Sequence, residues 1–185
     1  GAVTLKHGDA MERIPCETVL WAAGVRASPL GAVLAKRSGA ELDRGGRIIV
    51  EPDLSLPNHP EIYVIGDMAN CSHQNGQPLP GVAPVAMQQG RYIAKCIIHR
   101  STGKATPAFR YHDRGNLAII GRARAVADLG RVRLAGYWAW LAWLFIHLLY
   151  LVEFENRVLV LIQWGWYYFR RNRAARLITK NKPDC

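Results

Sequence analysis

The sequence has few cysteines, and no two of them lie at short spacing. Its 185 residues include four, at positions 16, 71, 96 and 185, and no CxxC pattern occurs. Neither a disulfide framework nor a zinc site with its usual ligand spacing is therefore indicated. We expect structural or incidental thiols in a reducing compartment. No metal site is expected, and His73 is predicted to be a solvated loop residue.

A glycine-rich phosphate-binding loop is also absent. The pattern GxGxxG, which binds a pyrophosphate between a strand and a helix, occurs nowhere in the chain. No residue suggests the nucleophile or the general base of a catalytic triad. The chain alone is therefore not expected to hold a complete dinucleotide, and no catalytic residue is assigned.

Acidic residues are outnumbered by basic ones. The chain has 24 Lys and Arg against 14 Asp and Glu, a formal charge of +10 at pH 7. This excess favours an anionic partner: nucleic acid, anionic lipid or a phosphorylated ligand. Hydrophobic residues make up 50% of the sequence, which is enough core material for one domain or one and a half.

The most informative stretch is residues 61–69, Glu-Ile-Tyr-Val-Ile-Gly-Asp-Met-Ala. Its β-branched and aromatic residues predict a short buried strand that ends at Gly66. A glycine there allows a ligand to approach the backbone. The carboxylate of Asp67 could accept hydrogen bonds from hydroxyl groups at the carboxyl end of a sheet. On its own, however, a strand followed by Gly-Asp is more often an ordinary turn.

A helix is predicted to begin at Pro84, which suits a first helical position because its missing N–H would be unpaired there. Small residues surround this position: Gly81, Ala83 and Ala86. They would let a flat ring lie close to the N–H groups of the helix start. Gln88 and Gln89 follow, and because successive helical residues point about 100° apart, we expect one to face a pocket and the other the protein.

Together these two segments resemble the flavin-binding return segment of the two-dinucleotide-domain flavoprotein oxidoreductases. In detail they are similar to the type II (non-proton-pumping) NADH:quinone oxidoreductases, and the resemblance covers nearly the whole chain. It implies an α/β fold class: a partial FAD/NAD(P)-binding Rossmann-like fold with antiparallel additions and an α-helical membrane-anchoring C-terminal module. The resemblance also implies that this chain is the C-terminal part of a longer enzyme and is inactive alone. Both phosphate-binding loops of that enzyme would lie upstream of residue 1.

The resemblance further implies a domain order and a reaction. Residues 1–24 would end an NADH-binding domain, residues 25–133 would form the returning part of an FAD-binding domain, and residues 134–185 would be a membrane anchor. Electrons would pass from NADH through FAD to a membrane quinone.

Site roles are also implied by the resemblance. Asp67 would bind the ribityl chain of FAD, and the start of the second segment's helix would face the flavin and the quinone pocket. Trp21-Ala22-Ala23-Gly24 would cross back from the NADH domain, with Gly24 near the nicotinamide. The implied cofactor contacts are Gly24, Gly66, Asp67, Met68, Val85, Ala86 and Met87. The implied quinone contacts are Gln88, Gln89, Trp140, Trp143 and His147. Pro84 replaces a glutamine that is frequent in the family, so that quinone contact does not carry over.

Elsewhere, short-range patterns predict further elements. Strands are expected at residues 2–6, 14–16, 18–24 and 48–50, and helices at residues 29–34 and 84–100. An antiparallel meander is expected between residues 109 and 134. Residues 71–80, which are polar and rich in Gly and Pro, are expected to form a surface loop over the site.

The C-terminal part is strongly apolar. No charged residue occurs from Leu134 to Val152, a run long enough for a membrane span on hydropathy alone. As a helix, this run would place Trp140, Trp143 and His147 on one face. Asn156-Arg157 interrupts it, residues 158–169 form a second apolar segment, and six Lys or Arg follow between residues 170 and 182.

These features favour membrane attachment. The second apolar segment is too short to cross as a straight helix, and the resemblance implies paired C-terminal helices that lie in one leaflet. We therefore expect a monotopic anchor bound to anionic lipid rather than a transmembrane hairpin, and the resemblance places it on the cytoplasmic face of a bacterial inner membrane. The alternative without a membrane is a buried core helix followed by a solvated basic tail.

Other functions stay open. Sulfide:quinone oxidoreductase shares the architecture but needs a redox cysteine pair, and Cys71 and Cys96 have no evident pairing. A soluble ferredoxin or rubredoxin reductase would not explain the apolar C-terminal segments. A non-enzymatic membrane-binding protein would not explain the strand-Gly-Asp segment. Nucleic acid is disfavoured because the basic residues follow an apolar aromatic module, which suits lipid better. The sequence does not specify which quinone is reduced or whether NADH or NADPH is the donor. It is compatible with a homodimer.

Overall fold

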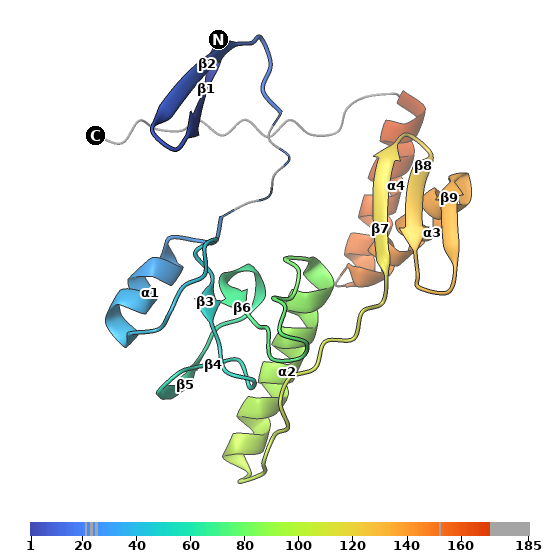
Figure 1. Cartoon of the computed structure of the whole chain (residues 1–185). Helices are drawn as coiled ribbons and strands as arrows, with labels where there is room; N and C mark the ends of the chain where they lie inside the picture. Colours follow the sequence, from blue (N-terminus) through green and yellow to red (C-terminus); the bar gives the residue numbers. More distant parts are fainter. Residues whose placement is uncertain (21, 23, 25, 152, 171–185) are drawn as a thin grey trace. The chain divides into compact units, whose positions relative to one another are not determined.

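The computed structural model of the chain describes residues 1–20, 22, 24, 26–151 and 153–170. These residues form two compact units, Gly1–His112 and Asp113–Cys185 (Figure 1). Helices and strands are mixed in both units. The α/β class predicted from the sequence is therefore confirmed.

The first unit begins with an antiparallel hairpin. Strand β1 (Ala2–His7) pairs with β2 (Ala10–Pro15), and Gly8 turns the chain with φ of 61°. The strand expected over residues 18–24 is not formed by its described members, since Val19 and Leu20 are exposed and lie outside any strand. A buried strand needs neighbouring strands, and the described part of the chain gives these residues none. Residues 21 and 23 of that prediction lie outside the described residues.

Helix α1 (Leu30–Ser38) follows Pro29 and ends at Gly39, whose left-handed φ of 74° closes the helix as the N–H donates to the Ala35 carbonyl. It extends four residues beyond the predicted end at residue 34. Strand β3 (Ile48–Ile49) then pairs in parallel with β6 (Ala69–Asn70).

The central strand lies earlier in the chain than the sequence predicts, beginning at His59 and ending at Tyr63 instead of at Gly66, and it is only partly buried because Pro60 and Glu61 are exposed. Strand β5 (His59–Tyr63) pairs antiparallel with β4 (Ser55–Leu56). Regular pairing ends at Tyr63 because β4 is only two residues long. Val64 stays buried and its N–H donates to the Leu54 carbonyl at 3.0 Å. The chain then enters a 3-10 turn, η1 (Gly66–Met68).

Helix α2 (Ala83–Ser101) packs its buried face against the remainder of this unit. That face carries Val85, Gln89, Ile93 and Cys96, spaced by three or four residues as a helical stripe requires. Ile93 and Cys96 join a core cluster with Leu54, Cys71 and Phe109. A second cluster contains Ile48, Leu56, Val64 and Ala69.

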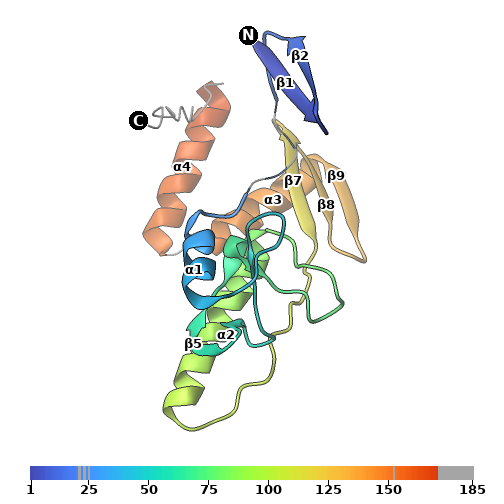
Figure 2. The same ribbon diagram turned by 60° about the vertical axis from the view of Figure 1, so that its left-hand side comes forward.

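After α2 the chain turns and runs back beside the helix (Figures 1 and 2). We call residues 107–112 the strap. Two glutamine side chains hold it in the manner of a neighbouring strand, each donating to the carbonyl and accepting from the N–H of one residue. Gln74 binds Tyr111 with distances of 3.2 and 3.0 Å, and Gln88 binds His112 with distances of 2.9 and 3.0 Å. Tyr92 also donates to the Pro107 carbonyl at 2.7 Å.

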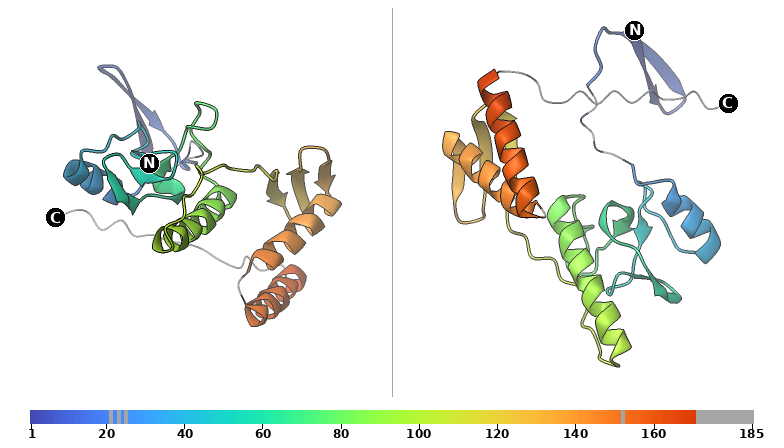
Figure 3. Two further views of the ribbon diagram at one scale, coloured as in Figure 1. Left: turned by 90° about the horizontal axis from the view of Figure 1, so that it is seen from below. Right: turned by 180° about the vertical axis from the view of Figure 1, so that it is seen from behind.

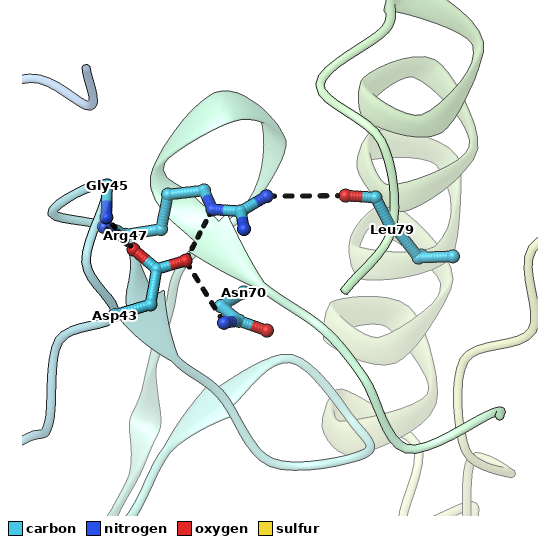
Figure 4. Close-up of polar contacts among 5 residues, drawn as sticks. All are labelled: Asp43, Gly45, Arg47, Asn70 and Leu79. Atoms are coloured by element: carbon cyan, nitrogen blue, oxygen red, sulfur yellow. Dashed lines mark hydrogen bonds and ion pairs between the residues drawn. The ribbon is translucent and has the colours of Figure 1, made fainter. Parts of the chain in front are cut away.

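A carboxylate cluster holds the segment before β3 (Figure 4). One oxygen of Asp43 accepts the backbone N–H groups of Gly45 and Arg47 at 2.8 and 2.9 Å. The other accepts the Arg47 Nε–H at 2.6 Å and the Asn70 amide at 3.1 Å, which links β6 to the cluster. Arg47 in turn donates to the Leu79 carbonyl at 3.4 Å. Both oxygens of the carboxylate are thus fully used.

The Asp43 cluster predicts an acid-labile contribution to stability. Burial by itself would raise the pKa of Asp43, but the hydrogen bonds from Arg47 and Gly45 and the charge of Arg47 outweigh it and lower that pKa. A lowered folded-state pKa stabilises the protein above the unfolded pKa, near 3.9, and the contribution is lost as pH falls through the folded pKa. Asp43→Asn should therefore lower the free energy of unfolding at neutral pH by about 1 to 3 kcal/mol.

Urea unfolding of the full chain over a range of pH tests this. The difference between wild type and Asp43→Asn should shrink as pH falls below about 4. Glu12→Gln, which changes an exposed acid on β2, serves as the control and should show a much smaller difference. A difference for Asp43→Asn that stays constant across the acid range would contradict the role of the ionised carboxylate.

The second unit is a three-stranded meander followed by two helices (Figure 3). Strands β7 (Asn116–Gly121), β8 (Arg124–Asp128) and β9 (Arg133–Gly136) pair in sequence order. Helix α3 (Tyr137–Tyr150) covers one face of this sheet, where Ala125, Ala127 and Ala139 are buried. Helix α4 (Phe154–Arg170) packs against α3. The predicted antiparallel meander is present, although it begins at Asn116 rather than at residue 109.

The first apolar run does not form one continuous helix. Its first residues complete β9, and Gly136, with φ of 76°, separates that strand from α3. The helix has 14 residues, a length of roughly 21 Å. Leu151 and Glu153, the latter with φ of 68°, lie outside both helices, whereas Asn156 and Arg157 lie inside α4. Among the described residues, none of the helices is long and apolar enough to cross a membrane.

Candidate functional site

The candidate site is built on the turn η1. Gly66 has φ of 68°, a left-handed conformation that glycine adopts without strain. Asp67 follows it with an exposed side chain. Within the described part of the chain, its carboxylate makes no hydrogen bond or ion pair. An exposed, unpartnered carboxylate on a tight turn is free to accept hydrogen bonds from a ligand.

The turn lies against the start of α2. A Cβ added to Gly66 would be 3.6 Å from the Cβ of Ala86, and one added to Gly81 would be 3.5 Å from the Asp67 carboxylate. The backbone of the 80–86 segment therefore passes close to Asp67. The residues predicted from the two separate sequence segments are brought together here.

The start of α2 offers fewer free N–H groups than the sequence suggests. Pro84 has none, and the N–H groups of Val85 and Ala86 donate to the Val82 carbonyl at 3.0 and 3.4 Å. The helix start can therefore act on a ligand mainly through the positive end of the helix dipole, because few of its N–H groups are free to donate hydrogen bonds. Of the predicted cofactor contacts here, Val85 is buried, while Ala86 and Met87 are half-buried, as is Met68 on the turn.

The two glutamines point in different directions. Gln89 is 1% exposed, and its side-chain oxygen accepts the Gly66 N–H at 2.7 Å. Gln88 is half-buried, and both ends of its amide are bonded to the His112 backbone. Contact of either residue with a quinone stays a prediction.

The predicted aromatic face forms the packed interface of α3 and α4. The Trp143 ring stacks on His147 with centroids 3.9 Å apart and on Trp164 of α4 at 5.6 Å. Trp140 lies between Tyr137 and Tyr168, at 5.8 and 5.6 Å. These aromatic contacts occupy the tryptophan rings.

His147 has a defined tautomer. Its Nδ1 lies 2.8 Å from the Trp143 carbonyl, which can only accept, so Nδ1 carries the proton. In the neutral imidazole the exposed Nε2 is then an acceptor.

Gly24, the remaining predicted cofactor contact, is exposed with φ of 90°. Its neighbours 23 and 25 lie outside the described residues, and its role near a nicotinamide stays a prediction.

In the described part of the chain, the cysteines form no disulfide. Cys71 and Cys96 share one buried cluster, and both are free thiols. Burial raises the pKa of the Cys71 thiol, an effect partly offset by its contact with His73, and this disfavours the reactive thiolate. His73 is exposed, but both ring nitrogens contact the protein: Nε2 lies 2.6 Å from the Phe109 carbonyl and Nδ1 lies 3.4 Å from the Cys71 sulfur. No group of three or more His, Cys, Asp or Glu suited to a metal occurs in the described ranges.

Sequence patterns did not show that Gln89 bonds to the turn. The two groups are 23 residues apart, and no local motif connects them. The only available signal was its position, because Gln89 falls on the otherwise apolar stripe of α2. A polar residue on such a stripe usually has a buried hydrogen-bond partner.

Two family models match the chain. One, described as pyridine nucleotide-disulphide oxidoreductase, matches residues 1–90. The other, described as the NDH2 C-terminal domain, matches residues 113–171. A solved structure of NDH2 from Plasmodium falciparum in complex with NADH has the same fold, with a TM-score of 0.66 at 17% identity over 88% of this chain and 47% of that one.

Curated relatives agree with these models. The type II NADH:quinone oxidoreductase NdhA of Mycobacterium tuberculosis (strain ATCC 25618 / H37Rv) is 45% identical over 183 residues, which cover 96% of this chain and 38% of the relative. A type II NADH:quinone oxidoreductase of Staphylococcus haemolyticus (strain JCSC1435) is 38% identical over 118 residues, which cover 63% of this chain and 28% of the relative.

The fold and the matched models define a member of the pyridine nucleotide-disulphide oxidoreductases. Within that class, the chain belongs to the family of type II NADH:quinone oxidoreductases. The resemblance identified from residues 61–69 and 80–90 is confirmed. The chain spans about 38% of the length of the two Mycobacterium tuberculosis relatives.

Proposed function

We propose that this chain supplies the flavin-binding turn, the quinone-facing helix start and the membrane-binding helices of a complete type II NADH:quinone oxidoreductase. The observation that supports this most strongly is the exposed Asp67 carboxylate on a Gly66 turn packed against α2. The complete enzyme would oxidise NADH and reduce a quinone, as the names of the relatives state for those proteins.

The residues around Asp67 suit FAD. Its carboxylate would accept hydrogen bonds from the ribityl hydroxyls, and Gly66 and Gly81 keep the backbone on both sides of it free of side chains. FAD, when bound, supplies the electron transfer between NADH and the quinone. The positive end of the α2 dipole would stabilise negative charge beside the helix start. Ala86 and Met87 would then lie along the edge of the flavin.

Of the two glutamines, we assign Gln88 to the quinone. Gln89 is buried and bonded to Gly66, whereas the amide of Gln88 is half-buried and bonded to the backbone of His112, which lies outside any helix or strand. An amide N–H that binds the His112 carbonyl can bind a quinone carbonyl in the same way. Quinone binding at Gln88 would therefore require exchange of that partner.

Gln88→Ala in the complete enzyme tests this assignment. The KM for quinone is expected to rise about tenfold, the effect of one lost hydrogen bond. Reduction of the flavin by NADH should remain normal, because Gln88 would contact only the second substrate. Steady-state quinone titration and stopped-flow flavin reduction measure the two steps separately.

Gln74→Ala is the matched control, since Gln74 makes the same pair of bonds to the strap one residue earlier. An equal rise of the quinone KM in both variants would assign the effect to the strap. If neither variant affects the quinone, the pocket lies elsewhere. The face with Trp140, Trp143 and the His147 Nε2 is then the second candidate.

For the helical part we propose monotopic membrane binding on the cytoplasmic face of a bacterial inner membrane. Helix α3 exposes Trp138, Phe145 and Leu149 at spacings of seven and four residues, and we call these the α3 stripe. Helix α4 exposes Phe154, Ile162 and Phe169, which we call the α4 stripe. Two helices with exposed apolar and aromatic side chains can insert into one leaflet without crossing it. Anionic lipid is the expected partner of the basic residues.

A sulfide:quinone oxidoreductase is not favoured as the alternative. That reaction needs a pair of redox cysteines, whereas Cys71 and Cys96 are buried, unbridged thiols in a hydrophobic cluster. A non-enzymatic membrane protein would leave the match of residues 1–90 to an oxidoreductase family without an explanation.

A further inference from the structure

Gln89 is the polar exception on the buried face of α2. The neighbouring members of that face are Val85, Ile93 and Cys96, and the side chain of Gln89 is 1% exposed. Burying an amide costs free energy unless its polar atoms are paired. An apolar residue would pack at this position without that cost, so the hydrogen bond that Gln89 makes is the physical reason for a glutamine.

The partner of Gln89 is the first N–H of the turn that carries Asp67. The first N–H groups of a helical turn have no acceptor within it, and a side chain just before the turn usually provides one. Here the preceding residue, Ile65, gives no side-chain cap. Gln89 instead supplies the acceptor from another element, at 2.7 Å.

This bond fixes a peptide group that the backbone alone leaves adjustable. Glycine adopts positive and negative φ about equally well, so Gly66 by itself does not determine the course of the turn. Helix α2 limits the turn on one side, since a Cβ added to Gly66 would already lie 3.6 Å from the Cβ of Ala86. The bond to Gln89 then sets the orientation of the Gly66 N–H, and with it the position of the adjacent Asp67 carboxylate.

We propose that Gln89 is a positioning residue for FAD binding, acting through the Gly66 N–H to hold the Asp67 carboxylate in place for the ribityl hydroxyls. It contacts neither the flavin nor the quinone. This inference rests on the proposed function, in which Asp67 binds FAD, and it separates the roles of two adjacent glutamines.

Gln89→Met in the complete enzyme tests the inference, because Met is similar in length and packs in apolar surroundings but provides no comparable acceptor. The Kd for FAD, measured by titrating the apoenzyme, is expected to rise about tenfold. The quinone KM of the variant saturated with FAD should stay within about twofold of wild type. Gln89→Asn, which shortens the side chain by one methylene and so withdraws the acceptor, should also raise the Kd. It replaces Gln89→Met in the test if that variant folds poorly.

Two control variants separate this role from general weakening of α2. Ile93→Ala removes an apolar side chain from the next turn of the same buried face. It should lower the Tm while leaving the Kd for FAD within about twofold. Gln88→Met makes the same substitution at the neighbouring position and should change the quinone KM rather than the Kd for FAD. A loss of FAD affinity in Ile93→Ala equal to that in Gln89→Met would overturn the positioning role.

A double-mutant cycle with Asp67→Ala identifies the path of the effect. If Gln89 acts through Asp67, Gln89→Met should have little further effect on the Kd for FAD once Asp67 is Ala. Additive effects would overturn the inference. If Asp67→Ala weakens FAD binding but Gln89→Met does not, only the positioning role fails. If Asp67→Ala leaves FAD binding unchanged, the proposed function fails first.

Discussion

Asp67→Ala is expected to yield a complete enzyme that purifies with most of its flavin missing. The Asp67 carboxylate is exposed, unpartnered among the described residues and close to the start of α2. A charge-assisted hydrogen bond of this kind contributes about 1.5 to 3 kcal/mol. The expected loss of affinity is therefore roughly tenfold to a hundredfold. Flavin content after dialysis, measured as the ratio of flavin to protein absorbance, reports it directly.

Two further variants make this result specific. Asp67→Asn keeps an acceptor but loses the charge, so its flavin content should lie between those of wild type and Asp67→Ala. Asp53→Ala removes another carboxylate, which accepts the N–H and the hydroxyl of Ser55 at 3.0 and 2.6 Å. Asp53→Ala should weaken the local structure at the start of β4 without depleting flavin. A folded Asp67→Ala enzyme with normal flavin content would show that the cofactor is held elsewhere.

The parts of the fold that could be predicted from the sequence are those set by local patterns. Strand β1 and helix α2 follow from turn residues and from helical spacing of apolar residues, whereas β2 begins at Ala10 although a strand was expected only from residue 14. The strand expected at residues 18–24 was wrong for its described members because a buried strand depends on neighbours that local sequence does not provide. Likewise, β5 is limited by the short β4 with which it pairs.

The apolar C-terminal run shows how composition can mislead. Hydropathy treats residues 134–152 as one segment, but the first of them complete the sheet and Gly136 turns the chain before α3 begins. Pairing with β8 decides this, since β9 adds a third strand over which α3 can pack. Neither charge nor hydropathy in the run itself contains that information.

For the candidate site, the sequence indicated the residues but not their bonds. The Gly66-Asp67 turn and the α2 start are close together, as the two motifs suggested. The different roles of Gln88 and Gln89 depend on partners 24 and 23 residues away. Such long-range pairs between side chain and backbone have no local signature, and only the three-dimensional structure brings them into view.

The second large effect concerns attachment to the membrane. Removing residues from 113 onward from the complete enzyme is expected to transfer it to the soluble fraction and to impair reduction of long-tailed quinones. The cut belongs at residue 113, the start of the second unit, because a cut at Leu134 would remove most of β9 and leave the edge of β8 that pairs with it open. Activity with short, water-soluble quinones should be retained, since they reach the flavin without lipid.

A smaller change can test the same proposal without removing a unit. The α4 stripe exposes Phe154, Ile162 and Phe169 by 78%, 64% and 82%. Each apolar side chain transferred from water into lipid contributes about 1.5 to 3 kcal/mol, so replacing all three by Ser should release most of the enzyme from membranes. Ile97→Ser with Ile98→Ser, which changes exposed apolar residues on α2, is the matched control and should not release it.

Salt and topology distinguish the manner of attachment. High salt screens the attraction between basic residues and anionic lipid but not apolar contact, so washing should leave the wild-type enzyme bound while weakening the α4 stripe variant further. In sealed vesicles with the first unit outside, labelling of Cys185 from the outside only is expected for helices that lie in one leaflet. Labelling of Cys185 from the inside would instead require a crossing and would contradict the monotopic arrangement proposed for α3 and α4.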